Sequence, residues 1–352
     1  MNRTPSAPRG RGAGSNPPNR FEHVVLERDQ DWDPANDPAP ATQFLRDHSQ
    51  SIISYNDSPD IPFTASLNPY RGCEHGCAYC YARPFHEYLG FSAGLDFETR
   101  IMVKEDAPKL LRQALAARSW KPQWLALSGV TDPYQPVERR LQITRRCLEV
   151  LLECRNPVGI VTKNHLVTRD VDLLLELAKF HAAGVSLSVT TLDSDLARRL
   201  EPRTSSPRQR LAAIETLARA GVPVGVMVAP VIPGLTDHEM PKILEAAAEA
   251  GATWAGKVVL RLPHAVGPLF EDWLEQNEPG KKEKTLNRIR AMHAGQLADA
   301  RFGARMRGEG LLADQISKLF HVACRKAGLA SEGPAFSVAA FRRPATAQME
   351  LW

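Results

Sequence analysis

The sequence has no apolar run long enough to cross a membrane, and no secretory signal peptide is recognisable at its start. It has only six cysteines in 352 residues, and a chain of this length can bury a core without disulfide bonds. The formal net charge of +4 is too small to indicate the charge of a partner. These absences argue against a membrane protein and against a small disulfide-held scaffold.

Three of the six cysteines lie in one short loop. Cys73, Cys77 and Cys80 have the spacing C-x3-C-x2-C, and the aromatic residue Tyr79 stands just before the third. Three thiolates on one loop can hold three irons of a [4Fe–4S] cube, whereas clusters that only carry electrons use four cysteines. The fourth iron would then be open to a small molecule, to which it can pass an electron.

A zinc site is the alternative explanation of the cysteine loop. Structural zinc needs four ligands, and His75 is the nearest candidate for the fourth. Only Glu74 separates His75 from Cys73, which leaves a cramped geometry. We therefore keep a zinc-stabilised, noncatalytic nucleic-acid-binding protein as the second hypothesis.

The composition divides the chain into three parts. Residues 1–20 are rich in Pro, Gly and Asn and contain four arginines and no acid, and residues 21–60 contain nine acids and two arginines. Such a composition predicts a disordered start followed by an irregular N-terminal arm over residues 1–60. We expect a core domain at residues 61–280 and a basic helical extension with a tail at residues 281–352.

Six apolar segments with strand character alternate with amphipathic helical stretches. Strands are expected at residues 64–68, 124–128, 158–162, 185–190, 222–228 and 256–261. Helices are expected from residue 107 and at residues 141–152, 171–182, 208–220 and 239–250, and Ala-Gly pairs at Gly184, Gly221 and Gly251 predict helix ends. The alternation predicts an α/β fold with a parallel sheet or barrel, which periodicity alone does not distinguish.

Polar residues follow these strands at the end where ligands bind in parallel α/β barrels. The candidates are Ser128, Asp132, Lys163, Ser188, Thr190, Glu201 and Arg203. The period of two in a strand predicts that Ser188 and Thr190 share one face. For Lys163 the alternative to a ligand contact is a salt bridge to Asp170 or Glu201.

The cysteine loop with its aromatic residue resembles the radical SAM superfamily. Residues 77–81, 131–136, 162–163, 169–170 and 230–234 make the chain similar to the spore photoproduct lyase-like branch, in particular to bacterial members labelled DNA repair photolyase-like. The resemblance implies a partial (β/α)6 TIM-type barrel that carries a [4Fe–4S] cluster on the three cysteines. It also implies reductive cleavage of S-adenosylmethionine (SAM) to a 5′-deoxyadenosyl radical, which abstracts hydrogen from a substrate.

The resemblance implies roles for the strand-end residues. We expect Lys163 at the SAM carboxylate, Ser128 and Asp132 at its amino group, Ser188 and Thr190 at its methionyl or ribose groups, Glu201 and Arg203 at the ribose or carboxylate, and Tyr79 beside the cluster. Residues 232–235 offer an apolar edge for adenine. We also expect a reducing electron donor of flavodoxin or ferredoxin type and, because such clusters need a reducing compartment, a cytoplasmic location.

One departure from that branch concerns the substrate. In true spore photoproduct lyases a cysteine just ahead of the serine matched by Ser128 returns a hydrogen to the product, and this chain has Ala126 and Leu127 there. The cluster and SAM chemistry are therefore carried over, but the substrate and the final hydrogen donor are not.

Nucleic acid remains a candidate substrate because of the charge near the C-terminus. Residues 281–352 contain thirteen Lys and Arg against six Asp and Glu. A basic face for phosphates is predicted from Lys281, Lys282, Lys284, Arg288, Arg290, Arg301, Arg305 and Arg307. The alternative is a solvated helix surface, and no recognition helix, zinc finger or base-stacking motif accompanies the charge.

Overall fold

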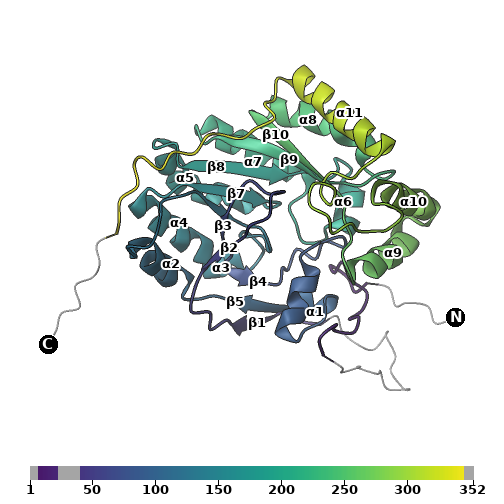
Figure 1. The fold of residues 1–352 in the computed structure, drawn as a ribbon, viewed down its shortest axis with the longest axis horizontal. Coiled ribbons are helices and arrows are strands. Elements are labelled where there is room, and N and C mark those ends of the chain that lie inside the picture. Colours follow the sequence, from purple (N-terminus) through teal and green to yellow (C-terminus); the bar gives the residue numbers. More distant parts are fainter. Residues whose placement is uncertain (1–6, 23–39, 345–352) are drawn as a thin grey trace.

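The computed structural model describes residues 7–22 and 40–344. Its main sheet contains β3 (Ala65–Leu67), β6 (Leu125–Leu127), β7 (Val158–Thr162), β8 (Ala183–Ser188), β9 (Val224–Val231) and β10 (Trp254–Val259), with β2 (Ile53–Tyr55) at one edge. The strand order is β10-β9-β8-β7-β6-β3-β2, and all neighbours are parallel except the antiparallel pair of β2 and β3. The predicted α/β fold with a partial (β/α)6 barrel is confirmed (Figure 1).

Helices connect the parallel strands along the outer side of the sheet. They are α2 (Ala107–Ala116), α3 (Glu138–Leu141), α4 (Ile143–Cys154), α5 (Val171–Ala178), α6 (Ser194–Leu200), α7 (Pro207–Arg219) and α8 (Met240–Glu249), with short 3-10 turns at η2 (His165–Asp170) and η3 (Asp237–Glu239). Apolar residues such as Val185 and Leu187 of β8 and Leu217 of α7 are fully buried in one core. Cys147 and Cys154 of α4 belong to that core as small apolar side chains.

The fourth and sixth strands begin and end two residues earlier than the sequence predicted. Strand β8 ends at Ser188, so Thr190 lies beyond the strand instead of sharing its face. The predicted helix end at Gly184 is wrong, because that residue is the second of β8. Gly221 and Gly251 do follow helices, with φ of 84° and 100°. An Ala-Gly pair marks a helix end only where the backbone enters the left-handed region, and Gly184 does not.

The inner face of the sheet carries small residues near the amino ends of its strands. A Cβ on Gly159 of β7 would lie 2.9 Å from the Trp124 ring, and one on Gly184 would lie 3.0 Å from Pro334 and 3.2 Å from Phe336. A segment close to the C-terminus therefore packs across this end of the sheet. Farther along the same face, Val161 of β7 is 39% exposed although β7 is a central strand.

A small second sheet holds the cysteine loop. It consists of β1 (Gln43–Arg46), β5 (Arg100–Val103) and β4 (Tyr70–Arg71), in the order β1-β5-β4. The cysteine loop leaves β4 and runs into η1 (Arg83–Leu89), which is followed by α1 (Leu95–Thr99). Figure 1 shows these elements together on one side of the main sheet, below it in that view.

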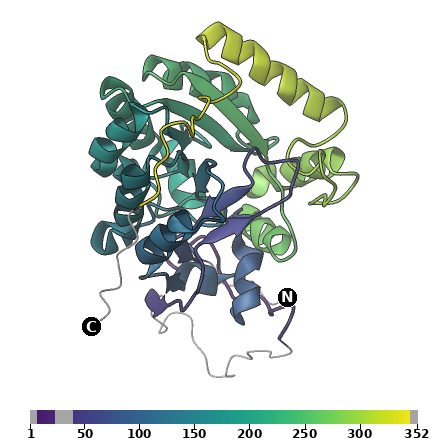
Figure 2. The same ribbon diagram turned by 60° about the vertical axis from the view of Figure 1, so that its left-hand side comes forward.

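The C-terminal extension is helical, as expected. It follows α9 (Val266–Asn277) and η4 (Pro279–Lys281) with α10 (Lys282–Met292) and α11 (Leu311–Ala327). Figure 2 shows α11, in yellow, on the outside of the barrel, where it packs against α8. Among the described residues, no helix has the length and apolar character that a membrane crossing requires.

Six of the eight residues of the predicted basic face have acidic partners. The ion pairs are Lys281–Glu278, Lys282–Glu275, Arg288–Asp237, Arg290–Glu271, Arg301–Glu309 and Arg305–Asp60. These pairs favour a solvated, ion-paired surface over the predicted basic face. In the tail, Arg342 and Arg343 bind carbonyl oxygens at the ends of α4 and α2, and residues 345–352 lie outside the described part.

Candidate metal and cofactor site at the mouth of the barrel

The three cysteines of the loop lie next to the carboxyl end of β3. Cys73 and Cys77 are each 7% exposed, and none of the three forms a disulfide. The loop turns tightly, because the Gly76 amide donates to the Cys73 carbonyl and the Cys80 amide donates to the Cys77 carbonyl. The thiols are close enough together for the charge on one to raise the pKa of another.

The electrostatics of the loop favour a positively charged ligand. Burial raises the pKa of Cys77 well above its usual range and that of Cys80 to about 11, and neighbouring thiolate charges add to both increases. Lys163 lowers both pKa values only in part. Burial therefore disfavours the thiolate forms of Cys77 and Cys80 unless a cation binds them, and three cysteines on one loop fit the irons of a [4Fe–4S] cluster as a donor set.

His75 is not available as a zinc ligand. Its Nδ1 lies 3.4 Å from an Asp132 carboxylate oxygen and its Nε2 lies 3.2 Å from the Asn164 amide nitrogen. Burial would lower its pKa, but Asp132 and Cys73 raise it to about 10, and both ring nitrogens already have partners. Among the described residues, no three His, Cys, Asp or Glu side chains are placed to hold one metal ion. The three cysteines of a [4Fe–4S] cluster bind three different irons, so their sulfur atoms stand farther apart than the ligands of a single ion. The finding on single-ion sites in the described residues therefore weakens the zinc alternative and does not bear on the cluster.

Several predicted site residues meet around a buried carboxylate. Glu201 follows α6 and is fully buried, and it accepts hydrogen bonds from the Tyr79 hydroxyl and from Thr190 Oγ1, the latter at 2.7 Å. Arg210 of α7 forms an ion pair with the other oxygen of Glu201. Lys163 Nζ lies 3.7 Å from Glu201 and donates to the Ala229 carbonyl at 2.8 Å. We call Tyr79, Lys163, Thr190, Glu201 and Arg210 the Glu201 group.

The charges of the Glu201 group are fixed by its members. Burial would raise the pKa of Glu201, but Arg210 and then Lys163 outweigh it and lower that pKa to about 2. Burial and the Glu201 charge raise the pKa of Tyr79 well above its usual range, so its hydroxyl stays a donor. The Lys163 side chain is 15% exposed and has one carbonyl partner at hydrogen-bond distance, which leaves donor capacity for an added anion.

Asp132 binds the backbone of Lys163 and the side chain of the residue before it. Its carboxylate accepts from Thr162 Oγ1 at 2.7 Å and from the Lys163 amide at 2.8 Å, besides its contact with His75. These bonds make Asp132 a residue that orients the start of the β7–η2 loop and the cysteine loop. Ser128 follows β6, and its hydroxyl lies 3.5 Å from the Thr131 carbonyl.

The structure does not bring Arg203 to the Glu201 group. Its guanidinium donates to the Gly10 carbonyl at 3.2 Å and lies 3.4 Å from both Thr42 Oγ1 and a Glu74 oxygen. The turn after α6 aims Glu201 inward, and two residues later Arg203 faces the start of the chain. Ser188 is buried, and its carbonyl accepts from Arg210.

A buried network behind the cysteine loop was not predicted. Glu138 of α3 pairs with Arg169 and accepts from the Tyr70 hydroxyl, and Tyr134 donates to Asp170 at 3.1 Å. Gln135 holds the loop itself: its side chain accepts from the Glu74 amide at 2.9 Å and donates to the Gly72 carbonyl. The motif residues 131–136 thus position the cysteine loop. In the sequence, this network was indicated only by the similarity of residues 131–136 and 169–170 to the spore photoproduct lyase-like branch.

Residues 7–22 contact the cysteine loop directly. We call this segment the N-terminal strap; it forms no helix or strand, as the sequence predicted, but it is packed where disorder was expected. The amides of Gly12 and Ala13 donate to the Glu98 carboxylate at 3.0 and 2.9 Å. Glu98 also pairs with Arg83, whose guanidinium donates to the Cys77 carbonyl at 2.9 Å. A chain of buried polar contacts therefore links the strap to a cysteine.

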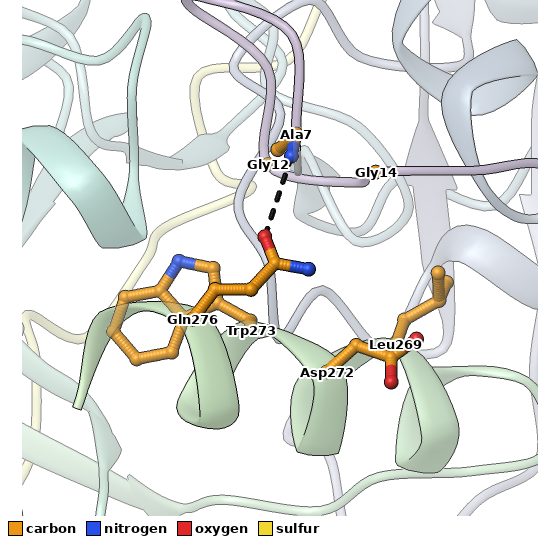
Figure 3. A pocket seen from close by; sticks show the side chains of 7 residues that line it. All are labelled: Ala7, Gly12, Gly14, Leu269, Asp272, Trp273 and Gln276. Carbon is orange, nitrogen blue, oxygen red and sulfur yellow. Dashed lines mark hydrogen bonds between the residues drawn. The ribbon is translucent and has the colours of Figure 1, made fainter. Parts of the chain in front are cut away.

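The approach of the strap to the loop requires glycine. A Cβ on Gly12 would lie 1.7 Å from the Gly76 carbonyl oxygen. Arg11, 6% exposed, donates to the Glu98 carbonyl and to Pro40 and Thr42. Toward its start the strap meets α9, where the Ala7 amide lies 3.4 Å from the Gln276 side-chain oxygen in a small pocket (Figure 3). Residues 1–6 and 23–39 lie outside the described part.

Comparison with known proteins agrees with this geometry. The family model described as "Radical SAM superfamily" matches residues 67–247, just over half of the chain. The chain belongs to the radical SAM superfamily. The match begins at the last residue of β3 and covers the cysteine loop and the strands up to α8, which include every member of the Glu201 group.

Several relatives and solved structures are similar to this radical SAM protein. An uncharacterised protein of Mycobacterium tuberculosis is 39% identical over 221 residues, which is 62% of this chain and 65% of that protein's length. A radical SAM Nalpha-GlyT isomerase of Pseudomonas phage M6 is 27% identical over 65% of this chain and 49% of its own. Spore photoproduct lyase complexed with dinucleoside spore photoproduct has a similar fold, with a TM-score of 0.57 at 16% identity over 82% of this chain and 81% of that one.

A second structure of that lyase contains a bound cofactor. A variant with bound AdoMet and dinucleoside spore photoproduct matches with a TM-score of 0.55 at 15% identity, over 84% of this chain and 82% of that one. At such identities the comparison establishes the fold alone. The chain therefore has the radical SAM barrel.

Proposed function

We propose that this protein is a radical SAM enzyme that binds a [4Fe–4S] cluster through Cys73, Cys77 and Cys80 and cleaves SAM reductively. The observation that carries the proposal is the set of three free thiols on one loop at the mouth of a radical SAM barrel, of which Cys73 and Cys77 are buried and Cys80 is partly exposed. When bound, the cluster supplies the electron that breaks a carbon–sulfur bond of SAM and yields methionine and a 5′-deoxyadenosyl radical.

The Glu201 group is the proposed recognition site for the polar end of SAM. Glu201 is ionised and holds Lys163 on one side while Tyr79 and Thr190 are fixed by hydrogen bonds to the same carboxylate. A lysine held in this way can pair with the SAM carboxylate as a point charge. Ser128 follows β6 and Ser188 ends β8, the two strands that flank β7, and these serines are proposed to contact the amino and methionyl groups.

A nucleic acid is the proposed substrate class, and the supporting observations come from relatives. The lyase with the similar fold has a structure in complex with a dinucleoside spore photoproduct. The position expected for a hydrogen-returning cysteine is occupied by Ala126 and Leu127, so the proposal does not include repair of that photoproduct. A reducing donor of flavodoxin or ferredoxin type is proposed as the electron source.

Anaerobic reconstitution tests the function. The loaded protein is expected to be brown, to contain about four irons per chain and to form 5′-deoxyadenosine from SAM when dithionite is added. Cys73→Ala, Cys77→Ala or Cys80→Ala should each abolish cluster loading. A well-loaded protein that never yields 5′-deoxyadenosine contradicts the proposal, and one zinc with no iron would instead support the noncatalytic alternative.

Lys163→Ala separates SAM binding from cluster binding. We expect an unchanged iron content and absorption spectrum, with SAM affinity reduced by roughly 10- to 100-fold for loss of a charged contact. Lys179→Ala is a suitable control, because Lys179 forms an exposed salt bridge with Glu176 away from the site. Loss of iron in Lys163→Ala, with iron kept in Lys179→Ala, would mean that Lys163 supports the loop and does not bind SAM.

A further inference from the structure

One cation at the mouth of the barrel has no salt bridge within the described part of the chain. Arg261 follows β10 by two residues, at the same end of the sheet as the cysteine loop. It forms no hydrogen bond and no ion pair with residues 7–22 or 40–344; the Tyr81 ring lies 4.6 Å from its guanidinium carbon, and the charges of Asp60 and Cys80 act on it from beyond salt-bridge distance. Burial lowers the pKa of Arg261, but an arginine stays charged at neutral pH. Its N–H donors therefore have no acceptor among residues 7–22 and 40–344.

Tyr81 fixes the guanidinium in place. This tyrosine directly follows Cys80, and its hydroxyl donates to the Gly129 carbonyl just beyond β6. Tyr81 thus reaches from the cysteine loop to one side of the open barrel, while Arg261 approaches it from β10 on the other side. A guanidinium stacked on a ring keeps its edge free for a bidentate contact with an oxyanion.

The proposed SAM anion site lies elsewhere. Lys163 follows β7, with β8 and β9 between it and β10 in the sheet, and it is held by Glu201 and the Ala229 carbonyl. The SAM carboxylate is therefore assigned to Lys163, and the charge of Cys80 reaches Arg261 without a direct contact. The further ligand that the proposed function places at the mouth is the molecule that reacts with the cofactor.

The surroundings of Arg261 favour a flat ring next to the anion. Arg305 is the nearest other cation and is neutralised by Asp60, so it does not compete for the anion. The Phe302 ring stacks with Arg305, 4.6 Å from the guanidinium carbon, and is 60% exposed. Tyr81 is itself 39% exposed. Exposed rings beside a free arginine match the alternation of bases and phosphates in a nucleotide chain.

We propose that Arg261, stacked on Tyr81, binds a phosphate group of the substrate at the mouth of the barrel and so makes the enzyme specific for phosphate esters of aromatic bases. This assignment rests on the proposed function, because it requires a substrate beside the cofactor. The phosphate can belong to a free nucleotide or to a polynucleotide, and the experiment distinguishes these two sources.

Binding of a labelled oligonucleotide tests the assignment without any turnover. Fluorescence anisotropy of fluorescein-labelled single-stranded oligothymidylate is measured with the reconstituted protein, and thymidine monophosphate and inorganic phosphate are added as competitors. Arg261→Gln is expected to weaken binding by roughly 10- to 100-fold, as for a lost charged contact. Arg307→Gln removes the same charge from an exposed position nearby and should change binding by no more than about threefold.

Two tyrosine variants examine the stack. Tyr81→Phe keeps the ring and should stay within about threefold of the natural affinity, whereas Tyr81→Leu removes it and should approach Arg261→Gln. Competition by the monophosphate at similar concentration points to a free nucleotide, and competition only by longer strands points to a polynucleotide.

The assignment fails under three results. The natural protein binds neither oligonucleotide nor monophosphate; Arg261→Gln binds as tightly as Arg307→Gln; or Arg261→Gln loses SAM affinity by calorimetry, which would place the arginine in the cofactor site. Formation of 5′-deoxyadenosine without substrate should persist in Arg261→Gln. If the natural protein forms none, the proposed function fails, while the binding measurements still decide the role of Arg261.

Discussion

The two terminal segments of the chain close opposite ends of the barrel by different means. The N-terminal strap meets the cysteine loop through buried hydrogen bonds and the Arg83–Glu98 ion pair. The segment containing Pro334 and Phe336 meets the other end mainly through apolar contacts with Gly184 and Trp124, besides a backbone hydrogen bond from the Ser337 amide to the His181 carbonyl. Hydrogen bonds and ion pairs are directional and apolar contacts are not, so only the first kind can set the orientation of a loop.

The difference predicts separate consequences for damage at the two ends. Loss of one partner from a buried polar set leaves the others desolvated and unpaired, so the cost is large. Loss of apolar contact costs in proportion to the area exposed and leaves the geometry elsewhere unchanged. Variants at the strap should therefore affect metal retention, and variants at the other end should affect stability alone.

The largest effect is expected from Glu98→Ala. The change leaves the fully buried Arg83 without its anion and the Gly12 and Ala13 amides without their acceptor. We expect the free energy of unfolding to fall by about 3–5 kcal/mol, measured by urea denaturation. Glu153→Ala breaks the more exposed Arg112–Glu153 pair and should cost less than about 1 kcal/mol. Similar losses in both variants would refute the description of the buried set.

Gly12→Val should displace the strap with a smaller loss of stability. The Cβ would collide with the Gly76 carbonyl, so the strap cannot keep its path beside the loop. We expect faster tryptic cleavage in residues 9–20 and a several-fold faster release of iron to a chelator. Gly280→Val, where nothing lies within 4 Å of the added Cβ, is the control. Unchanged cleavage and iron release in Gly12→Val would show that the strap does not support the cysteine loop.

Gly184→Val tests the apolar end. The added side chain would press on Pro334 and Phe336 and should cost about 1–3 kcal/mol through overpacking. The iron content per folded chain and the rate of iron release should match those of the natural protein. If iron release accelerated as in Gly12→Val, the two ends of the barrel would be coupled and the contrast between them would be lost.

The smallest effect is a pH dependence confined to the strap side. Burial lowers the pKa of His86 in η1 to about 4, whereas an unfolded histidine titrates near 6.5. The unfolded state therefore binds the proton more readily, and stability falls as the pH drops from about 6.5 toward 4, by roughly 1–2 kcal/mol at pH 5. His86→Gln should flatten this slope in urea titrations at pH 7 and pH 5. His181→Gln, at an exposed histidine near the opposite end, should leave it unchanged.

The order of strands and helices followed from sequence because each element has a strong local pattern. The alternation from residue 64 to residue 261 predicted six parallel strands, with boundaries displaced by two residues in β8 and β10. The packing of both terminal segments was not predictable in the same way. Gly12 and Glu98 are 86 positions apart in the chain, and neither has a local pattern that indicates the other.

The candidate site was predictable where one short segment defines it. The three cysteines and Tyr79 occupy eight consecutive positions, and Lys163 directly follows a strand, so its aim is fixed by that strand. Arg203 lies in an irregular turn, where the sequence gives no direction for the side chain, and the structure turns it toward residues 7–22. The contacts of Arg210 of α7 and of Arg261 could not be predicted, because they join distant elements.

The exposure of Val161 bears on how water is excluded from the proposed site of reaction. In a closed eight-stranded barrel the inward residues fill the interior in layers. Here the sheet stops at β10, and a valine in the middle of it still meets solvent. In the proposed function, exclusion of water from this face of the sheet therefore depends on the bound cofactor and substrate, because the strand side chains leave Val161 uncovered. A radical formed there would be shielded only while both are bound.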